Sequence, residues 1–473
     1  MLARINATGV RICSPRSLSE NLSGPLNLAA MSSQAPALSR PSALRQPLRL
    51  LASLVSLRYV LLRASTAGAA VAFGLVQTFV FARVLGAHEF SLYILIGTFG
   101  VSLWLFDLGA AKILYVRQRE RHLAGGSDSA VPAQSAAVVI LYALIVLAGT
   151  LACFAATAAR GSGAAADYAL FFAFAALNLV WFPLRNVSNA VDAYIRFETL
   201  EAVRRIGHIG LMLALLIGLP FEVFLVAANA LWALVFAICI AGLARCGALS
   251  PPRGFIATLA AFWRGNRAQI LRSGNYAVAE LAIYNFPYFV VPAAFGLGAP
   301  TIVLDTVFKI FRGTTLVYAA GLDPLVPRQT RAMAARDAKS LKRATLTAFL
   351  LCAVPTLALC AILLFAGDRL FALLLGHAAT VPPMATKLLV VLLIANLAQN
   401  VASNLLLHTG FFREIARIAT ILAAAMAAMT IVAIAAGAGI VGFIGGYTTV
   451  YVGGAALYLV ALWRGPFRRA AER

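Results

Sequence analysis

Three charged residues stand in an otherwise apolar stretch of the chain, TIVLDTVFKIFRG. Asp305, Lys309 and Arg312 are spaced four and then three residues apart, which places all three on one face of a helix. Such a face is costly against lipid, so we expect it to line a cavity or to meet partners. A lysine and an arginine in a low-dielectric site attract a phosphate-bearing group, and a guanidinium can bind two phosphate oxygens at once.

Glu280, in the apolar stretch AVAELAIYNFPYF, is the expected partner of this face. Arg312 lies about 12 residues, or about 18 Å, from the outer end of its predicted helix, and Glu280 lies about nine residues from the inner end of the preceding one. Both are therefore near the membrane midplane. Two interpretations stay open. A Glu280–Arg312 ion pair only neutralises charge and joins the helices, or Lys309 and Arg312 bind a ligand while a released Glu280 takes up a proton.

Five further charged residues are candidates for the same site, namely Arg83, Asp107, Lys112, Arg185 and Arg272. Arg83 is expected either to bind ligand or to reach the membrane surface along its own helix. Asp107 is expected to stabilise a helix end or to pair with a base of the second half. Arg185 and Arg272, at inner helix ends, either receive an anionic headgroup or are loop charges, and Lys112 near the inner mouth fits the ordinary loop pattern.

The elements that carry these residues must be membrane helices. Of the 473 residues, 62% are hydrophobic and 12% are charged, and the mean hydropathy is +0.87. Average soluble chains are about a quarter charged, so this chain cannot cover a soluble surface. Apolar runs of about 18 residues or more recur along it, which indicates a polytopic membrane protein.

The periodicity predicts about twelve spanning helices. They are expected at residues 64–84, 90–113, 134–158, 166–186, 203–219, 221–244, 271–296, 300–322, 343–366, 386–407, 414–436 and 440–463. Prolines at 287, 292 and 355 are expected to interrupt or kink two of them. The predicted fold class is therefore an all-α polytopic membrane protein with two six-helix bundles around a central cleft.

The formal charge of +22 follows the loops. With both termini inside, nearly all bases outside the spans fall in inside loops, as membrane topology requires, and nothing indicates a nucleic-acid partner. The inside bases include Arg117, Arg119, Arg121, Arg196, Arg204, Arg205, Arg245, Arg253, Arg264, Arg267, Arg328, Arg331, Arg336, Arg413, Arg417 and Arg464. The outside loops are short, so a large outer catalytic domain is not expected.

The chain is expected to divide into five parts. These are a disordered or amphipathic inner tail at 1–63, a six-helix bundle at 64–244, an inner linker at 245–270, a second six-helix bundle at 271–463 and an inner tail at 464–473. Within the first part, the basic, apolar segment 48–63 either lies in the membrane interface or extends the first spanning helix.

The two bundles are predicted to be repeats of each other. When Leu85-Gly86-Ala87 is set over Leu297-Gly298-Ala299, Phe99 meets Phe311 and Arg119 meets Arg331. Both copies enter the membrane after a Gly-containing turn and leave into a basic loop. They share one orientation, so they are parallel repeats, and a substrate path is expected between them.

No motif points to catalysis or to a bound cofactor. The six cysteines are scattered without C-x-x-C spacing, so neither a metal site nor a disulfide framework is predicted. The phosphate-binding G-x-x-x-x-G-K-[ST] pattern is also absent from the sequence. We expect a chain that is not an enzyme, that holds no metal and no cofactor, and that acts as a monomer.

Three segments resemble a known family. RVLGAHEFSLY with the later DLG (Asp107–Gly109) resembles the opening hairpin of oligosaccharide flippases, the Wzx-like transporters of the multidrug/oligosaccharidyl-lipid/polysaccharide superfamily. LGAPTIVLDTVFKIFR with GLDPLVPRQTRAMAARD resembles their eighth helix and its exit loop, and AVDAYIRFETLEAVRRIG resembles their loop between helices four and five. The resemblance covers nearly all of residues 64–463. The family usually has plain apolar residues where this chain has Lys309 and Arg312.

The resemblance implies a function. Such proteins move an undecaprenyl-diphosphate-linked oligosaccharide from the inner to the outer leaflet of the bacterial inner membrane, by alternating access, for O-antigen, capsule or exopolysaccharide synthesis. The implied partners are that lipid-linked glycan, membrane lipid, and the polymerase and export machinery. Two alternatives stay open. One is a cation-coupled multidrug antiporter of the same superfamily, for which an acidic cavity is expected. The other is a membrane-embedded polysaccharide polymerase or glycosyltransferase.

Overall fold

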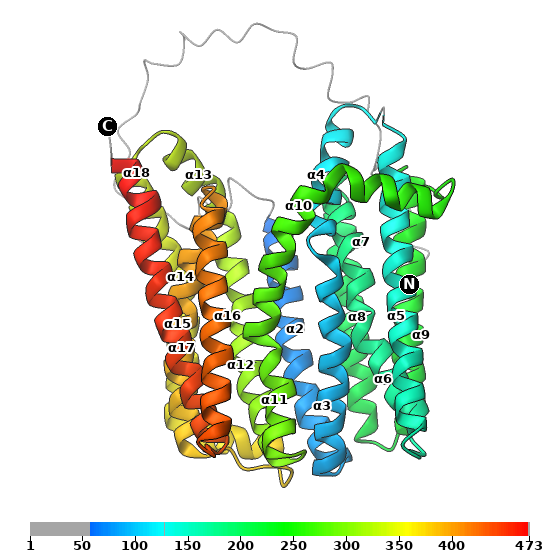
Figure 1. Ribbon diagram of the computed structural model, residues 1–473, viewed down its shortest axis with the longest axis vertical. Helices are drawn as coiled ribbons and strands as arrows, with labels where there is room; N and C mark the ends of the chain where they lie inside the picture. The colour runs from blue at the N-terminus through cyan, green and yellow to red at the C-terminus, as the bar shows by residue number, and fades with distance from the viewer. Residues whose placement is uncertain (1–56, 127, 472–473) are drawn as a thin grey trace, which may run out of the picture.

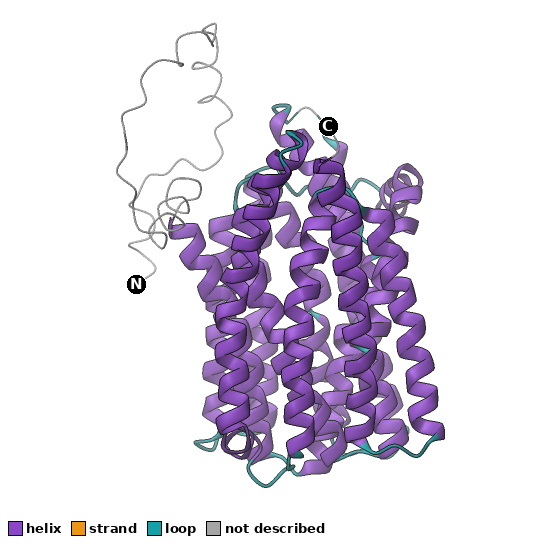
Figure 2. Cartoon of the chain, turned by 90° about the vertical axis from the view of Figure 1, so that its left-hand side faces the viewer, coloured by secondary structure: helices purple, strands orange, loops and turns teal. Residues whose placement is uncertain are grey.

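The computed structural model describes residues 57–126 and 128–471, and the chain forms helices joined by short loops (Figure 1). Within these residues there is no strand, and Figure 2 shows long helices running the length of the molecule with the loops at its two ends. The sequence-predicted class, an all-α polytopic membrane protein, is confirmed. Residues 1–56 of the expected inner tail lie outside the described residues.

Half one contains helices α2 to α9. They are α2 (Leu57–Val84), α3 (Ala87–Ser102), a 3-10 segment (Leu103–Asp107), α4 (Ala110–Leu123), α5 (Ala130–Ala158), α6 (Ala165–Ala176), α7 (Asn178–Ala190), α8 (Tyr194–Leu215) and α9 (Phe221–Arg245). Residues 57–63 form the first turns of α2, so this part of the basic segment extends the first spanning helix.

Half two contains helices α10 to α18. They are α10 (Phe255–Tyr284), α11 (Phe286–Phe295), α12 (Ala299–Leu322), a 3-10 turn (Asp323–Leu325), α13 (Val326–Ala334), α14 (Ala338–Leu375), α15 (Pro383–His408), α16 (Phe412–Ala435), α17 (Ile440–Leu462), a π-helical segment (Trp463–Phe467) and α18 (Arg468–Ala471). Because α10 begins at Phe255, most of the linker expected at 245–270 is helical.

Within the described residues, ten helical stretches are long and apolar enough to cross a membrane. The remaining two predicted spans correspond to α8 and α12, which have 22 and 24 residues. Both carry several charged side chains, which is why composition alone does not single them out. These two helices carry most of the chemistry described below.

The two halves meet along a seam that includes α2 and α3 of half one. Helix α2 of half one packs against α12 and α14 of half two, and α3 packs against α11 and α12. Figure 1 shows α2 and α3 beside α11 and α12 at the centre of the molecule, while the first turns of α10 lie across the upper end of half one. The charged face predicted on α12 therefore belongs to an element that touches both halves.

Several predicted helices are interrupted. The span expected at 90–113 breaks where Leu108 and Gly109 adopt left-handed conformations, with φ of 43° and 82°. The helix preceding α12 breaks at Asn285, next to Pro287, as its prolines predict. Helix α14, in contrast, runs without interruption through Pro355. A break exposes backbone groups to new partners, so the breaks mark places where side chains can be positioned between helices.

Turns at corresponding places in the two predicted repeats share a backbone hydrogen-bond pattern, which also follows α9 and α16. After α7, the N–H groups of residues 191, 192 and 193 donate to carbonyls four, three and five residues earlier, and residues 409, 410 and 411 after α15 do the same. The turns after α4 and α13 share this pattern, at residues 124–126 and 335–337. The residue numbers of the turn after α15 exceed those of the turn after α7 by 218. Those of the turn after α13 exceed those of the turn after α4 by 211. Aligned at these helix ends, Arg119 lies opposite Thr330, one residue before the Arg331 that the comparison of the two sequences places there.

Candidate functional site

The charged face of α12 lies on the seam between the halves. Asp305 is buried, and its Oδ2 lies 2.7 Å from the ammonium of Lys309 one turn later. The same ammonium donates to Thr78 Oγ1 of α2 at 3.1 Å. Lys309 thus joins its own helix to half one, and its side chain remains 20% exposed. The charged face of α12 therefore has a polar partner on half one and does not lie only against lipid.

Arg312 is held at the break between α10 and α11. Its Nη2 donates to Asn285 Oδ1 at 3.0 Å, and its guanidinium lies 5.7 Å from the centre of the Tyr284 ring, within the range of a cation–π contact. Asn285 also donates to Ser102 Oγ of α3 at 3.4 Å. Because Asn285 is neutral, it orients Arg312 without cancelling its charge. The predicted Glu280–Arg312 ion pair stays a prediction.

Behind Tyr284, a chain of buried polar groups crosses half two. The hydroxyls of Tyr284 and Tyr451 lie 3.3 Å apart, and Tyr451 donates to Asn396 Oδ1 at 2.9 Å. Asn396 Nδ2 in turn donates to Thr314 Oγ1 of α12 at 2.9 Å. Buried hydrogen-bonded networks of this kind fix side-chain positions. They connect α10, α12, α15 and α17, and so hold the side of Arg312 in place.

Sequence reasoning did not predict this chain of polar groups. Tyr447 and Tyr451 lie one turn apart on α17, which is also how an ordinary aromatic core appears. Asn396 begins a polar run in α15 that continues with Gln399, Asn400, Ser403 and Asn404, and that run was the usable signal, since a buried amide requires partners.

Arg83 joins the halves at the end of α2. Its guanidinium donates to the carbonyl oxygens of Leu373 at 2.6 Å and Leu374 at 3.3 Å, and it lies 3.6 Å above the Phe79 ring. Both carbonyls belong to the last turn of α14, where backbone acceptors lack helical partners. Arg83 therefore caps a helix of the other half, a role that neither sequence interpretation included.

Asp107 stabilises a helix end, one of the two expected roles. Its carboxylate accepts from the backbone N–H groups of Gly109 and Ala111, both at 3.0 Å, and from the Tyr142 hydroxyl at 2.8 Å. These bonds start α4 after the left-handed turn, and all three partners belong to half one. Lys112 is exposed on the same helix.

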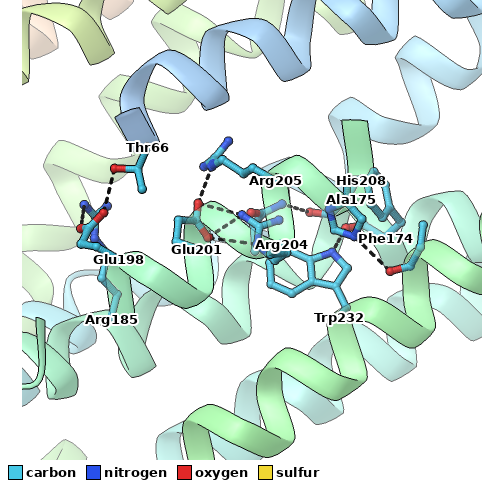
Figure 3. A network of polar contacts seen from close by, with 12 residues as sticks. Thr66, Phe174, Ala175, Arg185, Glu198, Glu201, Arg204, Arg205, His208 and Trp232 are labelled. Carbon is cyan, nitrogen blue, oxygen red and sulfur yellow. Dashed lines mark hydrogen bonds and ion pairs between the residues drawn. The ribbon is translucent and has the colours of Figure 1, made fainter. Parts of the chain in front are cut away.

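Arg185 pairs within half one (Figure 3). Its Nη2 lies 3.3 Å from Glu198 Oε1 of α8, and Thr66 of α2 donates to Glu198 Oε2 at 2.9 Å. About a third of the Arg185 side chain is exposed, whereas Glu198 is buried. A ligand that binds Arg185 would therefore share its guanidinium with Glu198. The side chain of Arg272 lies outside the described part of the chain.

A buried ionic cluster on α8 corrects one sequence prediction (Figure 3). The sequence predicts Arg204 in an inside loop, but α8 begins at Tyr194 and places it inside the bundle, 4% exposed. Its guanidinium donates to both carboxylate oxygens of Glu201, at 2.7 to 3.0 Å, and lies 3.9 Å from the Trp232 ring. Arg205 also donates to Glu201. The E-x-x-R-R spacing, which gives pairs one helical turn apart, was the usable signal.

The fold is known from other proteins. No family model matches the chain, and no curated protein matches it by sequence. Among solved structures, the eukaryotic MATE transporter AtDTX14 superposes with a TM-score of 0.59 at 14% identity, covering 91% of this chain and 99% of that one. A single-residue mutant of the Vibrio cholerae MATE transporter VcmN gives 0.59 at 13% identity over 88% and 98%. This chain has the MATE transporter fold.

A third similar structure comes from Pyrococcus furiosus. It is a transporter of the MOP superfamily whose binding pocket is described as having reversed polarity, suggesting a different function, and it superposes with a TM-score of 0.58 at 14% identity over 90% of this chain and 96% of that one. Together with the ten candidate spans in the described residues, these likenesses show a multi-pass membrane protein of MATE-like architecture.

Proposed function

We propose that the chain moves an anionic lipid-linked oligosaccharide, of the undecaprenyl-diphosphate type, from the inner to the outer leaflet of a bacterial inner membrane by alternating access. The observation that carries the proposal is the position of Lys309 and Arg312 on α12, at the seam between the halves. Both halves contribute to their surroundings, so a ligand held there would contact both halves.

The charges of this face favour an anion. Asp305 balances one of the two cations, so the three residues together carry one excess positive charge. Arg312 is oriented by a neutral amide and by an aromatic ring, and both leave its charge in place. Charge-assisted bonds from a guanidinium to phosphate oxygens are short and strong, and they gain strength where water is scarce. A diphosphate is the group that such an arrangement serves best.

The glycan and the lipid place further demands on the path. A sugar needs polar partners, and the exposed Thr315 and the half-buried Asn400 both bond to Asn396 of the polar chain described above. The isoprenoid chain needs none and can remain in the bilayer while the headgroup crosses between the halves. The proposal therefore requires only that the headgroup pass the seam.

A multidrug antiporter is the second candidate, since the fold is shared with a multidrug resistance MATE transporter that superposes with a TM-score of 0.57 at 13% identity. An organic cation would bind to Glu280 or Asp305 instead of to Arg312. In this chain, however, Asp305 already lies 2.7 Å from Lys309. A cation would have to displace that ammonium, whereas the hydrogen bond from Arg312 to Asn285 is made to a neutral amide.

A flipping assay separates the two candidates. Purified protein is reconstituted into vesicles with a fluorescent undecaprenyl-diphosphate-linked sugar, and the fraction reaching the opposite leaflet is measured by chemical quenching. We expect Arg312→Ala to reduce the rate at least about tenfold, Arg312→Lys to retain part of it, and the exposed Arg264→Ala to leave it unchanged. A normal rate in Arg312→Ala would refute the proposal. Uptake of an organic cation that survives in Arg312→Ala but is lost in Asp305→Asn would favour the antiporter.

A further inference from the structure

The two repeats differ at one corner of the inner loops, and the difference leaves a pocket. In half one this corner lies between the end of α4 and the turn after α7. Arg119 Nη1 lies 2.8 Å from Asp192 Oδ1, and His122 Nε2 lies 3.4 Å from Asp192 Oδ2. Arg119 also donates to the carbonyl of Ala190 at 3.2 Å. An ion-paired cluster thus ties helix to turn.

The backbone match gives the equivalent residues of half two. The turn after α4 matches the turn after α13 with an offset of 211, so Arg119 corresponds to Thr330 and His122 to Met333. The turn after α7 matches the turn after α15 with an offset of 218, so Asp192 corresponds to Gly410. Asp192 and Gly410 both have left-handed backbones, with φ of 59° and 86°, which supports the correspondence.

The replacements remove all three ionisable groups and much of their bulk. In their place is a pocket of about 440 Å³, and Thr330, Met333 and Gly410 all line it together with Leu407, His408 and Phe412. This volume is in the range of ligand sites in proteins. The pocket exists where the other half has a carboxylate, and its walls are mainly apolar.

The charged and apolar residues around the pocket indicate which kind of ligand it binds. Arg331 and Arg413 follow directly on the lining residues Thr330 and Phe412, and both are exposed. Phe412 itself is 63% exposed and Leu407 40%, at the same end of the bundle as the basic loops.

His408 in the pocket wall has the charges of Asp323 and Lys112 near it, so the acid and the base there offset each other. The two exposed arginines next to mainly apolar walls then fit an amphiphile with a negative headgroup. The chain's own residues 1–56 fit less well, because they contain six arginines and one glutamate.

We propose that this pocket, between α13 and the turn from α15 to α16, binds an anionic phospholipid of the inner leaflet. Its phosphate lies at the Arg331 and Arg413 rim, and apolar parts of the lipid contact Met333, Leu407 and Phe412. In half one, Asp192 bridges α4 to the turn after α7. The lipid has the corresponding role in half two, where it bridges α13 to the turn after α15. The lipid thereby adds a link between α13 and the turn after α15 that depends on an anion from the membrane.

The test uses the full chain and a tryptophan at the pocket. In a Phe412→Trp variant, the additional emission relative to wild type is quenched with brominated phosphatidylglycerol or with brominated phosphatidylcholine. We expect phosphatidylglycerol to quench at about tenfold lower mole fraction, because two arginines near the surface each favour an anionic lipid. Thr330→Arg with Gly410→Asp rebuilds the ion pair of half one inside the pocket and should remove the preference.

Two controls keep the outcome interpretable. Arg331→Gln with Arg413→Gln leaves the apolar walls intact, and it should equalise the two lipids without abolishing quenching. Arg312→Ala should leave lipid binding unchanged, so failure of the proposed transport function and failure of this site are distinguishable. Equal quenching by the two lipids in the parent variant, or a preference that survives Thr330→Arg with Gly410→Asp, would overturn the proposal. So would a preference that appears only after residues 2–56 are deleted, which would identify that segment as the occupant.

Discussion

Arg83 offers a direct test of how the two halves are held together. Replacing it by alanine removes two bonds to the last-turn carbonyls of Leu373 and Leu374 and a cation–π contact with Phe79. Bonds from a charged donor contribute about 1.5–3 kcal/mol each when sheltered, and an exposed cation–π contact about 0.5–1 kcal/mol. Because Arg83 is exposed, water replaces part of this. We expect Arg83→Ala to weaken the contact between halves by about 1–2 kcal/mol.

At this end of the molecule the two halves can be in contact or separated. A loss of this size shifts the equilibrium toward the separated state by about five- to thirtyfold. The assay is a distance distribution between spin labels at the exposed positions His88 and His377, in a background without cysteines. We expect a longer-distance population to grow in Arg83→Ala and not in Arg160→Ala, which removes another exposed arginine of half one. If the distributions of wild type and Arg83→Ala coincide in both detergent and lipid, the guanidinium does not hold the halves together.

Two further predictions concern stability. Gly454→Ala should destabilise the protein by about 1–3 kcal/mol in a thermal unfolding assay, because an added Cβ would lie 2.5 Å from the buried Leu422 side chain. The control Gly453→Ala has open space around the added Cβ and should be neutral in the same assay. Arg204→Ala should cost about 3 kcal/mol by leaving Glu201 poorly paired, and Glu201→Leu with Arg204→Met should recover most of it. Equal melting temperatures for the two glycine variants, or a double variant less stable than Arg204→Ala, would contradict these accounts.

Sequence reasoning succeeded where a single segment carries its own signal. The spacing of Asp305, Lys309 and Arg312 indicated one helical face, and the structure places Lys309 and Arg312 among polar partners at the seam. The spans were predicted because apolar length is a local property, and the repeat was predicted because both copies keep their order of turns and basic loops. Each of these signals lies within about 25 residues or depends on a comparison of two such stretches.

The partners of these residues could not be predicted in the same way. Arg83 bonds to carbonyls about 290 residues away, and Lys309 to a threonine 231 residues away, and no local pattern encodes such pairings. The sequence places Arg204 among the inside-loop bases, at the very start of the span predicted at 203–219, because its charge outweighs the apolar signal of the residues after it. Only the packing of Trp232 and Glu201 around it shows that a helix already surrounds this charge.

The bond from Lys309 to Thr78 gives ligand arrival a mechanical meaning. An incoming anion that draws the ammonium toward itself must take it from Asp305, from Thr78, or from both. Loss of the bond to Thr78 removes a link between α12 and α2, whereas Asp305 lies on α12 itself. A site filled in that way resists relative sliding of the two bundles less than an empty one. In the proposed transport cycle, binding of the cargo would therefore loosen the contact between the two halves.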